Sequence, residues 1–173
     1  MSLEVAVPVI LTIISAATPL LLAGIGELVV ERSGVLNLGV EGMMLAGAVT
    51  AFAVTFSTGS YTAGILAAAL AGILLALIFG VLTLTLVSNQ VATGLALTLF
   101  GLGLSALVGG GFVGSPVDPL PNLAIPGLSD IPVIGPIVFG QDVLVYLSVA
   151  LTIGVAWFLR RTRGGMILRA CGD

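Results

Sequence analysis

The amino-acid sequence predicts an all-α fold: a polytopic transmembrane helix bundle of about five spanning helices. The first observation is composition. Of the 173 residues, 58% are hydrophobic and only 8% are charged, and the mean hydropathy is +1.28. A soluble domain carries about 25% charged residues, so a lipid bilayer is the natural solvent for this chain. The other two observations are the length of the apolar stretches and the position of the arginines.

Five stretches are long enough to cross a bilayer, which takes roughly 20 apolar residues. They do not alternate between polar and apolar side chains as barrel strands do, so helices are expected. Pro19 interrupts the first stretch. The five predicted helices cover residues 5–30, 35–56, 62–87, 91–113 and 143–159.

The arginines set the expected orientation. Four of them follow the last helix, and placing that group in the cytoplasm puts Arg32 on the same side after counting back through the helices. The N-terminus is then outside, the C-terminus is cytoplasmic, and the loop 114–142 is external. This loop holds six of the eight prolines, so its backbone is expected to be irregular. It is interpreted as a structured external cap, or alternatively as a docking surface for an external partner.

Composition also excludes several kinds of chemistry. There is no histidine and every basic residue is an arginine, which removes Schiff-base chemistry, the Walker lysine and histidine-based sites. Cys171 has no second cysteine with which to form a disulfide. The net charge of −3, without a large basic cluster, gives no sign of nucleic-acid binding. No catalytic residue, metal site or cofactor is predicted.

Small residues recur along the third and fourth predicted helices. A spacing of four keeps them on one helix face, and lipid offers no hydrophobic drive between helices, so close backbone packing is expected there. In the third helix these residues are Gly64, Ala68, Gly72, Ala76 and Gly80, and in the fourth they are Gly94, Gly101, Ser105 and Gly109.

A polar motif, "ERSGVLNLGVEG", lies between the first two apolar stretches at residues 31–42. Asn37 and Glu41 are four apart and would share one face of a helix. A charge inside the membrane is costly, so the carboxylate is expected to face protein or water, or to be protonated. The glycines at 34, 39 and 42 weaken the helix and allow another backbone to come close. A broken or distorted helix lining a cavity is therefore one interpretation.

Each polar candidate has two interpretations. Asn37 and Glu41 either tie helices together by hydrogen bonds or belong to a solute pathway. Asn89 and Gln90 are either turn residues on the cytoplasmic side or pathway residues. Glu27 and Glu31, next to Arg32, are interpreted as an interfacial charge cluster rather than as a substrate site.

Three segments resemble permease subunits of bacterial ABC importers, in the branch that handles sugars, branched-chain amino acids and nucleosides. The first is "GELVVERSGVLNLGVEGMMLAGA" at 26–48. The other two are "IPGLSDIPVIGPIVFGQDVLVYL" at 125–147 and "RTRGGMILRACGD" at 161–173, which are closer to the nucleoside-type permeases. The resemblance runs through most of the chain in order.

The resemblance implies a permease that works with partners in a bacterial plasma (inner) membrane. These are a second permease chain, cytosolic ATPase subunits that hydrolyse ATP, and an external substrate-binding protein or lipoprotein. Residues 160–173 would begin the cytoplasmic coupling region, and the residues that match it are Arg163, Gly164, Arg169 and Gly172. Residues 1–173 would be a single transmembrane permease domain, incomplete at its C-terminus.

The expected function is therefore that of a permease subunit lining part of the pathway for a small polar solute, most specifically a nucleoside. Two alternatives belong to other classes. One is an ion-coupled secondary carrier or channel in which Glu41 is the ion or proton site. The other is a structural membrane subunit that transports nothing.

Overall fold

The computed structural model describes residues 3–123 and 135–172. The chain divides into two compact units, one made of Met1–Ser33 with Pro119–Asp173 and the other of Gly34–Asp118. Among the described residues, all regular elements are helical apart from an isolated bridge between Asn122 and Asp142. Within the described ranges, five helices are long and apolar enough to cross a membrane. The predicted all-α class is confirmed, while the orientation in the membrane stays a prediction.

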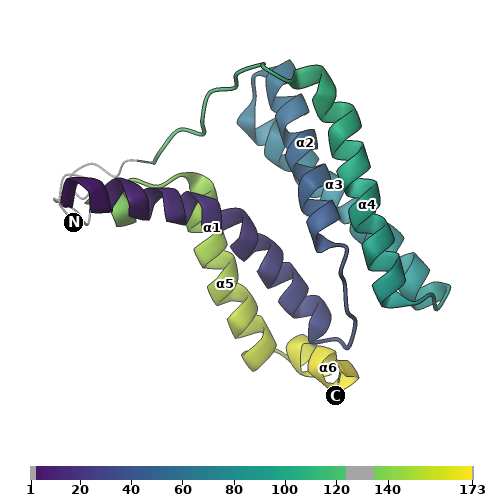
Figure 1. Ribbon diagram of the computed structural model, residues 1–173. Coiled ribbons are helices and arrows are strands. Elements are labelled where there is room, and N and C mark those ends of the chain that lie inside the picture. The colour runs from purple at the N-terminus through teal and green to yellow at the C-terminus, as the bar shows by residue number, and fades with distance from the viewer. Residues whose placement is uncertain (1–2, 124–134, 173) are drawn as a thin grey trace. The chain divides into compact units, whose positions relative to one another are not determined.

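The unit Gly34–Asp118 is a stack of three helices, α2 (Val40–Thr58), α3 (Tyr61–Gly80) and α4 (Gln90–Gly109) (Figure 1). Most of the packing is between α2 and each of the other two helices. The buried core draws on all three, with Ala46 from α2, Leu75 and Phe79 from α3, and Leu97 from α4. At the end of the unit that holds the α2–α3 turn, Phe52, Phe56 and Phe112 form an aromatic cluster with ring centroids 5.5–6.3 Å apart.

Two predicted helix boundaries in this unit need correction. The second helix begins at Val40 and not at residue 35, because the residues before it are not helical. The third is α-helical only to Gly80 and continues as a π-helical turn, η1 (Val81–Thr85). Val87 then has a φ of 51°, a left-handed conformation that is strained for a β-branched residue. The two residues after Val87 lead directly into α4, which begins at Gln90.

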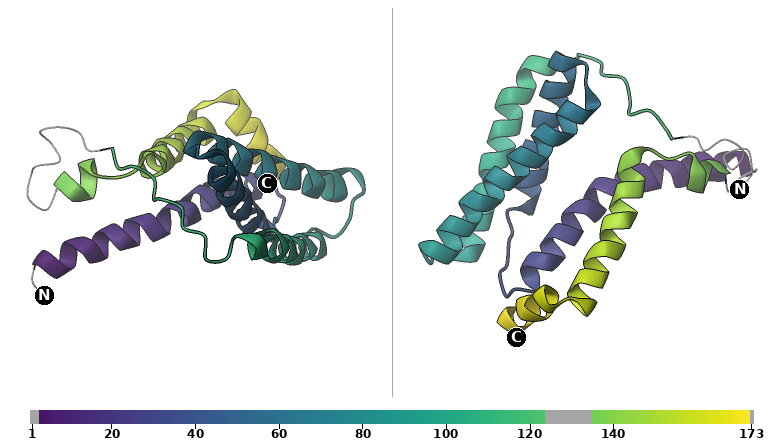
Figure 2. Two further views of the ribbon diagram at one scale, coloured as in Figure 1. Left: turned by 90° about the horizontal axis from the view of Figure 1, so that it is seen from above. Right: turned by 180° about the vertical axis from the view of Figure 1, so that it is seen from behind.

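In the other unit, α1 (Leu3–Glu31) packs along α5 (Val143–Arg161). Pro19 was expected to interrupt the first helix, but it lies inside α1. The helix continues through it and bends part-way along its length, as Figures 1 and 2 show. Proline removes one backbone hydrogen bond and its ring pushes against the preceding turn, which bends a helix.

A short helix, α6 (Arg163–Gly172), follows α5 almost at once and packs against it. Thr162 makes the sharp turn possible. Its hydroxyl oxygen accepts a hydrogen bond from the Gly165 N–H at 3.0 Å, which caps the start of α6.

The predicted external loop 114–142 is described only in part, because residues 124–134 lie outside the described residues. Within it, η3 (Gly135–Phe139) is a π-helical turn that packs on α1. The buried Gln141 side chain donates to the carbonyls of Pro136 and Ile137, and the Tyr146 hydroxyl donates to Val138. Side chains near the start of α5 therefore hold this turn in place.

Candidate functional site

The candidate site is built around the non-helical stretch that precedes α2, called here the 34–39 segment. Gly34 opens it with a φ of 80°, a conformation that glycine adopts without strain. Residues 35–37 have no regular structure, and Gly39 caps the start of α2. This stretch joins two helices of membrane-spanning length, and wherever such backbone is out of contact with water its N–H and C=O groups take partners within the protein.

Helix α4 supplies two of those partners. The Gln90 Oε1 atom accepts a hydrogen bond from the Leu36 N–H at 2.8 Å. Two turns further along α4, the Thr98 hydroxyl donates to the Leu38 carbonyl oxygen at 2.8 Å. Residues eight apart lie near one helix face, so a single face of α4 holds the segment.

Asn37 shapes the segment from within. Its side chain is buried, and its Oδ1 atom accepts a hydrogen bond from the Gly39 N–H at 3.0 Å. Its amide nitrogen lies 3.8 Å from the Met43 sulfur in the first turn of α2. Asn37 therefore fixes the turn that leads into the helix, as asparagine side chains commonly do.

Glycines allow the segment and α2 to lie directly on α4. A Cβ atom at Gly94 would lie 2.8 Å from the Leu38 nitrogen, and one at Gly42 would lie 2.6 Å from the Thr98 Cα. A Cβ at Gly101 would lie 2.5 Å from the Gly42 Cα. The predicted close backbone approach is confirmed at Gly42, Gly94 and Gly101, whereas a Cβ at Gly39 or Gly109 would meet side chains.

The prediction that Asn37 and Glu41 share a helix face is wrong, because the helix begins only at Val40. Asn37 points into the packed segment, whereas Glu41 is exposed in the first turn of α2. A carboxylate is electrostatically favoured there, next to the unpaired N–H groups of the helix N-terminus. In place of a broken helix lining a cavity, the structure has an irregular stretch between α1 and α2, and the pathway role of Asn37 and Glu41 stays a prediction.

The other two pathway candidates lie at the start of α4. The Asn89 side chain accepts a hydrogen bond from the Ala92 N–H at 3.0 Å and so caps the helix. Gln90 is the first helical residue and binds Leu36 as described above. The structure thus brings Gln90 and Asn37 to the same segment, and leaves Asn89 with a capping role.

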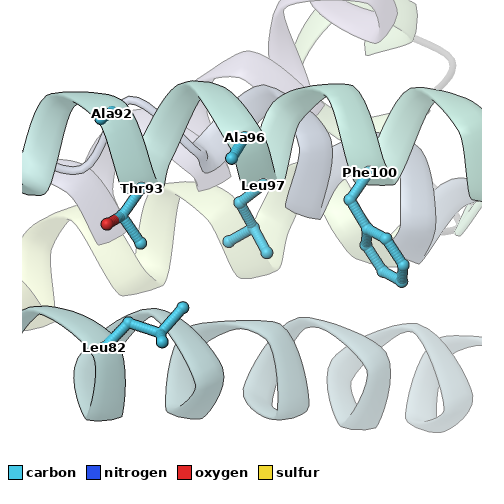
Figure 3. Close-up of a pocket in the computed structure, with 6 residues that line it drawn as sticks. All are labelled: Leu82, Ala92, Thr93, Ala96, Leu97 and Phe100. Carbon is cyan, nitrogen blue, oxygen red and sulfur yellow. The ribbon is translucent and has the colours of Figure 1, made fainter. Parts of the chain in front are cut away.

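A pocket of about 400 Å³ opens beside this arrangement, between η1 and α4. Figure 3 shows Thr93, Leu97 and Phe100 projecting from α4 toward the helix that carries Leu82. The lining is apolar except for Thr93, whose hydroxyl lies 2.9 Å from that of Ser88. Leu97 also packs close to Gly39, where an added Cβ would lie 3.0 Å from the Leu97 Cδ2 atom. Leu97 therefore takes part both in lining the pocket and in packing the 34–39 segment.

The small-residue face of the third helix is packed unevenly within this chain. A Cβ at Gly64 would lie 2.9 Å from the Ala51 carbonyl of α2, and Ala68 lies beside Gly47. In contrast, a Cβ at Gly72 or Gly80 would have no neighbour within 4 Å, and Ala76 is exposed. Only the part of this face nearest the α2–α3 turn is used for contact inside the unit.

The candidate coupling residues all lie on α6. Arg163, Gly164 and Gly172 are exposed, and Arg169 is half-buried with its Nε donating to the Gly165 carbonyl at 3.4 Å. Gly165 was not singled out from the sequence, yet it is the buried contact, because a Cβ there would lie 2.7 Å from the Leu159 Cα. It lets α6 pack directly on the end of α5.

Thr98 was also missed. Its signal in the sequence is its spacing from the glycines of the fourth helix, four residues after Gly94 and three before Gly101. A hydroxyl on the face that approaches another backbone is well placed to bond to it. Among the described residues, no group of three or more Cys, Asp or Glu side chains is arranged to hold a metal ion.

These features define a multi-pass helical membrane protein with an irregular segment whose backbone is bonded to α4. The family of branched-chain amino acid transport system permease components matches residues 9–173, and the chain belongs to that family.

Three relatives have informative names. The chain is 41% identical over 165 residues to "Putative glucose ABC transporter permease protein TsgC13" of Haloferax volcanii, covering 92% of this chain and 50% of the relative. It is 33% identical over 172 residues to the guanosine ABC transporter permease protein NupQ of Bacillus subtilis, covering 91% and 53%. It is 32% identical over 169 residues to the nucleoside ABC transporter permease protein NupC of Lactococcus lactis, covering 91% and 53%.

The chain therefore spans about half the length of the curated relatives it matches. No solved structure matches it at a significant level.

Proposed function

We propose that this chain forms part of the solute pathway of an ATP-driven importer in a plasma (inner) membrane. The observation that carries the proposal is the 34–39 segment, an irregular stretch between helices of spanning length, bonded to Gln90 and Thr98. Irregular backbone is found at membrane depth where it is buried in protein or lines a water-filled cavity. The printed names of the relatives, which are ABC transporter permease proteins, support the same function.

The proposed solute is a hydroxyl-rich molecule, a nucleoside or a sugar. The named relatives are assigned glucose, guanosine and nucleosides. Of the four pathway candidates, Glu41 is the one we place against the solute, since its side chain is exposed at the end of the segment. Asn37 and Gln90 act by shaping the segment and Asn89 by capping α4.

The proposed partners are a second permease chain, cytosolic ATPase subunits that hydrolyse ATP, and an external substrate-binding protein or lipoprotein. Helix α6 is the proposed contact with the ATPase, through the exposed Arg163 and Gly164 and through Gly172 near its end. Because α6 packs against the end of α5, a partner bound to α6 would act directly on a helix of membrane-spanning length.

Uptake by cells that carry the intact importer tests the function. We expect uptake of a labelled nucleoside or sugar to continue when a proton uncoupler is added and ATP is maintained, and to stop when ATP is depleted. Competition between guanosine and glucose identifies the solute class. Uptake that collapses with the uncoupler at constant ATP would contradict the proposal and favour the ion-coupled carrier.

A further inference from the structure

A second pocket, of about 200 Å³, lies within the unit formed by α1, α5 and α6. Its lining contains three of the chain's five arginines, Arg32, Arg160 and Arg169. The remaining lining residues are apolar: Leu28, Ala156 and Leu159. No acidic side chain is among the described residues that line it.

The three arginines come from distant positions in the sequence. Arg32 follows the last turn of α1, and Arg160 lies in the last turn of α5. Arg169 is brought near them because the chain turns at Thr162 and α6 packs on the end of α5 through Gly165. Its Nε also donates to the Gly165 carbonyl, which limits the positions its guanidinium can take.

The lining suits one kind of ligand. Three guanidinium groups around a small volume repel one another, so an anion between them is stabilised by all three. Guanidinium groups bind phosphate oxygens through paired hydrogen bonds, which makes arginine the usual residue for phosphate recognition.

The apolar residues identify the source of that phosphate. Leu28, Ala156 and Leu159 belong to helices of membrane-spanning length, Arg32 and Arg160 lie at the ends of those helices, and Arg169 lies on α6, which packs on α5. The pocket therefore joins an apolar wall to a cationic rim at the expected membrane surface. Basic pockets between transmembrane helices are a recognised setting for lipid headgroups.

We propose that Arg32, Arg160 and Arg169 bind the phosphate group of an anionic phospholipid at the membrane surface. None of these three arginines is among the residues proposed for the solute pathway or among the exposed residues of α6 proposed to contact the ATPase. The proposed site assigns Arg169, which the sequence places in the coupling region, to lipid binding within the pocket instead. A bound headgroup bridges α1, α5 and α6 and so stabilises the position of α6.

The test uses the purified intact importer in detergent, titrated with phosphatidylglycerol or phosphatidylcholine, with binding followed by native mass spectrometry and thermal stability. The variants are Arg160→Gln and Arg169→Gln. Arg161→Gln is the matched control, because Arg161 is exposed like Arg160 and next to it, but does not line the pocket. We expect each pocket variant to weaken phosphatidylglycerol binding about fivefold, and the control to change it by less than about twofold.

A separate arm adds inorganic phosphate alone. Stabilisation by phosphatidylglycerol but not by inorganic phosphate, lost in the two pocket variants, supports a lipid site. Arginine-dependent stabilisation by both supports the phosphate site and shows that a free ion also occupies it. Equal losses in all three variants, or equal binding of phosphatidylglycerol and phosphatidylcholine, would overturn the proposal.

Discussion

At the scale of single residues, most of the hydrogen bonds that polar side chains make in the described residues are to backbone groups of the same chain. Gln90 and Thr98 bond to Leu36 and Leu38, and Asn37 bonds to Gly39. In a membrane, a backbone N–H or C=O group without a hydrogen-bond partner costs several kcal/mol. These three side chains therefore supply hydrogen-bond partners to the backbone of the segment that joins α1 and α2.

Replacing Thr98 tests this role. Thr98→Val keeps the shape of the side chain and removes the hydroxyl that donates to Leu38, so we expect the free energy of unfolding to fall by about 1 kcal/mol. Thr98→Ser keeps the hydroxyl and is the matched control. Both are measured by denaturation of the full-length permease in detergent. Equal stability of the two variants would show that the hydrogen bond does not hold the segment.

At the scale of the elements, the contact between α2 and α4 depends on glycines that leave no room for a side chain. The Gly101 position touches the backbone at Gly42, whereas a Cβ at Gly103, two residues later on the same helix, would have no neighbour within 4 Å. The two positions offer a comparison in which helix, residue type and substitution are the same.

We expect Gly101→Ala to destabilise the permease by about 1–3 kcal/mol, because the methyl group forces two backbones apart. Gly103→Ala is expected to leave stability unchanged or slightly raised, since alanine favours helix. Thermal unfolding of the detergent-solubilised protein measures both. A Gly101→Ala variant as stable as Gly103→Ala would be inconsistent with the packing described.

Helix α6 provides a second comparison between glycines. Gly165→Ala would push a methyl group against Leu159 and lift α6 from the end of α5. In the assembled importer we expect the solute-stimulated ATPase rate to fall severalfold. Gly154→Ala, in an open position on α5, is the control. If both variants keep the normal stimulated rate, α6 does not need its close packing for coupling.

The elements were largely predictable from the sequence because apolar runs of membrane-spanning length have few other structures available. The places where the structure departs from the predicted helices were not predictable. The run from residue 35 reads as a continuous helix because Val35, Leu36 and Leu38 are as apolar as the helix after them. Its backbone is instead bonded by Gln90 and Thr98, residues more than 50 positions away, and nothing local in the sequence reports that contact.

The same limit applies to the candidate site. Asn37 and Gln90 were recognisable as polar residues in an apolar chain, but their bonding partners were not. Arg169 was predicted as a coupling residue and Gly165 was not singled out, and the contacts of both depend on the turn of the chain at Thr162. Spacing within one helix is readable from sequence, whereas contacts between helices require the fold.

At the scale of the whole molecule, the predicted topology places all five arginines on the cytoplasmic side. Cys171 follows Arg169 on α6 and is exposed, which makes it a natural reporter of sidedness. In intact cells, we expect a membrane-impermeant maleimide to leave Cys171 unlabelled, and to label it after permeabilisation. Labelling from outside intact cells would reverse the assigned orientation.

The central claim is that the 34–39 segment and the first turn of α2 border the solute pathway of an importer. Its most direct test is solute protection of a cysteine at position 41, measured in the full importer with Cys171 replaced by alanine. We expect Glu41→Cys to react with a water-soluble thiol reagent, and the transported nucleoside or sugar to slow that reaction. Leu99→Cys, at an exposed apolar position on α4, is the control and should show no protection. A residue 41 that is unreactive, or whose reaction no transported solute slows, would contradict the claim.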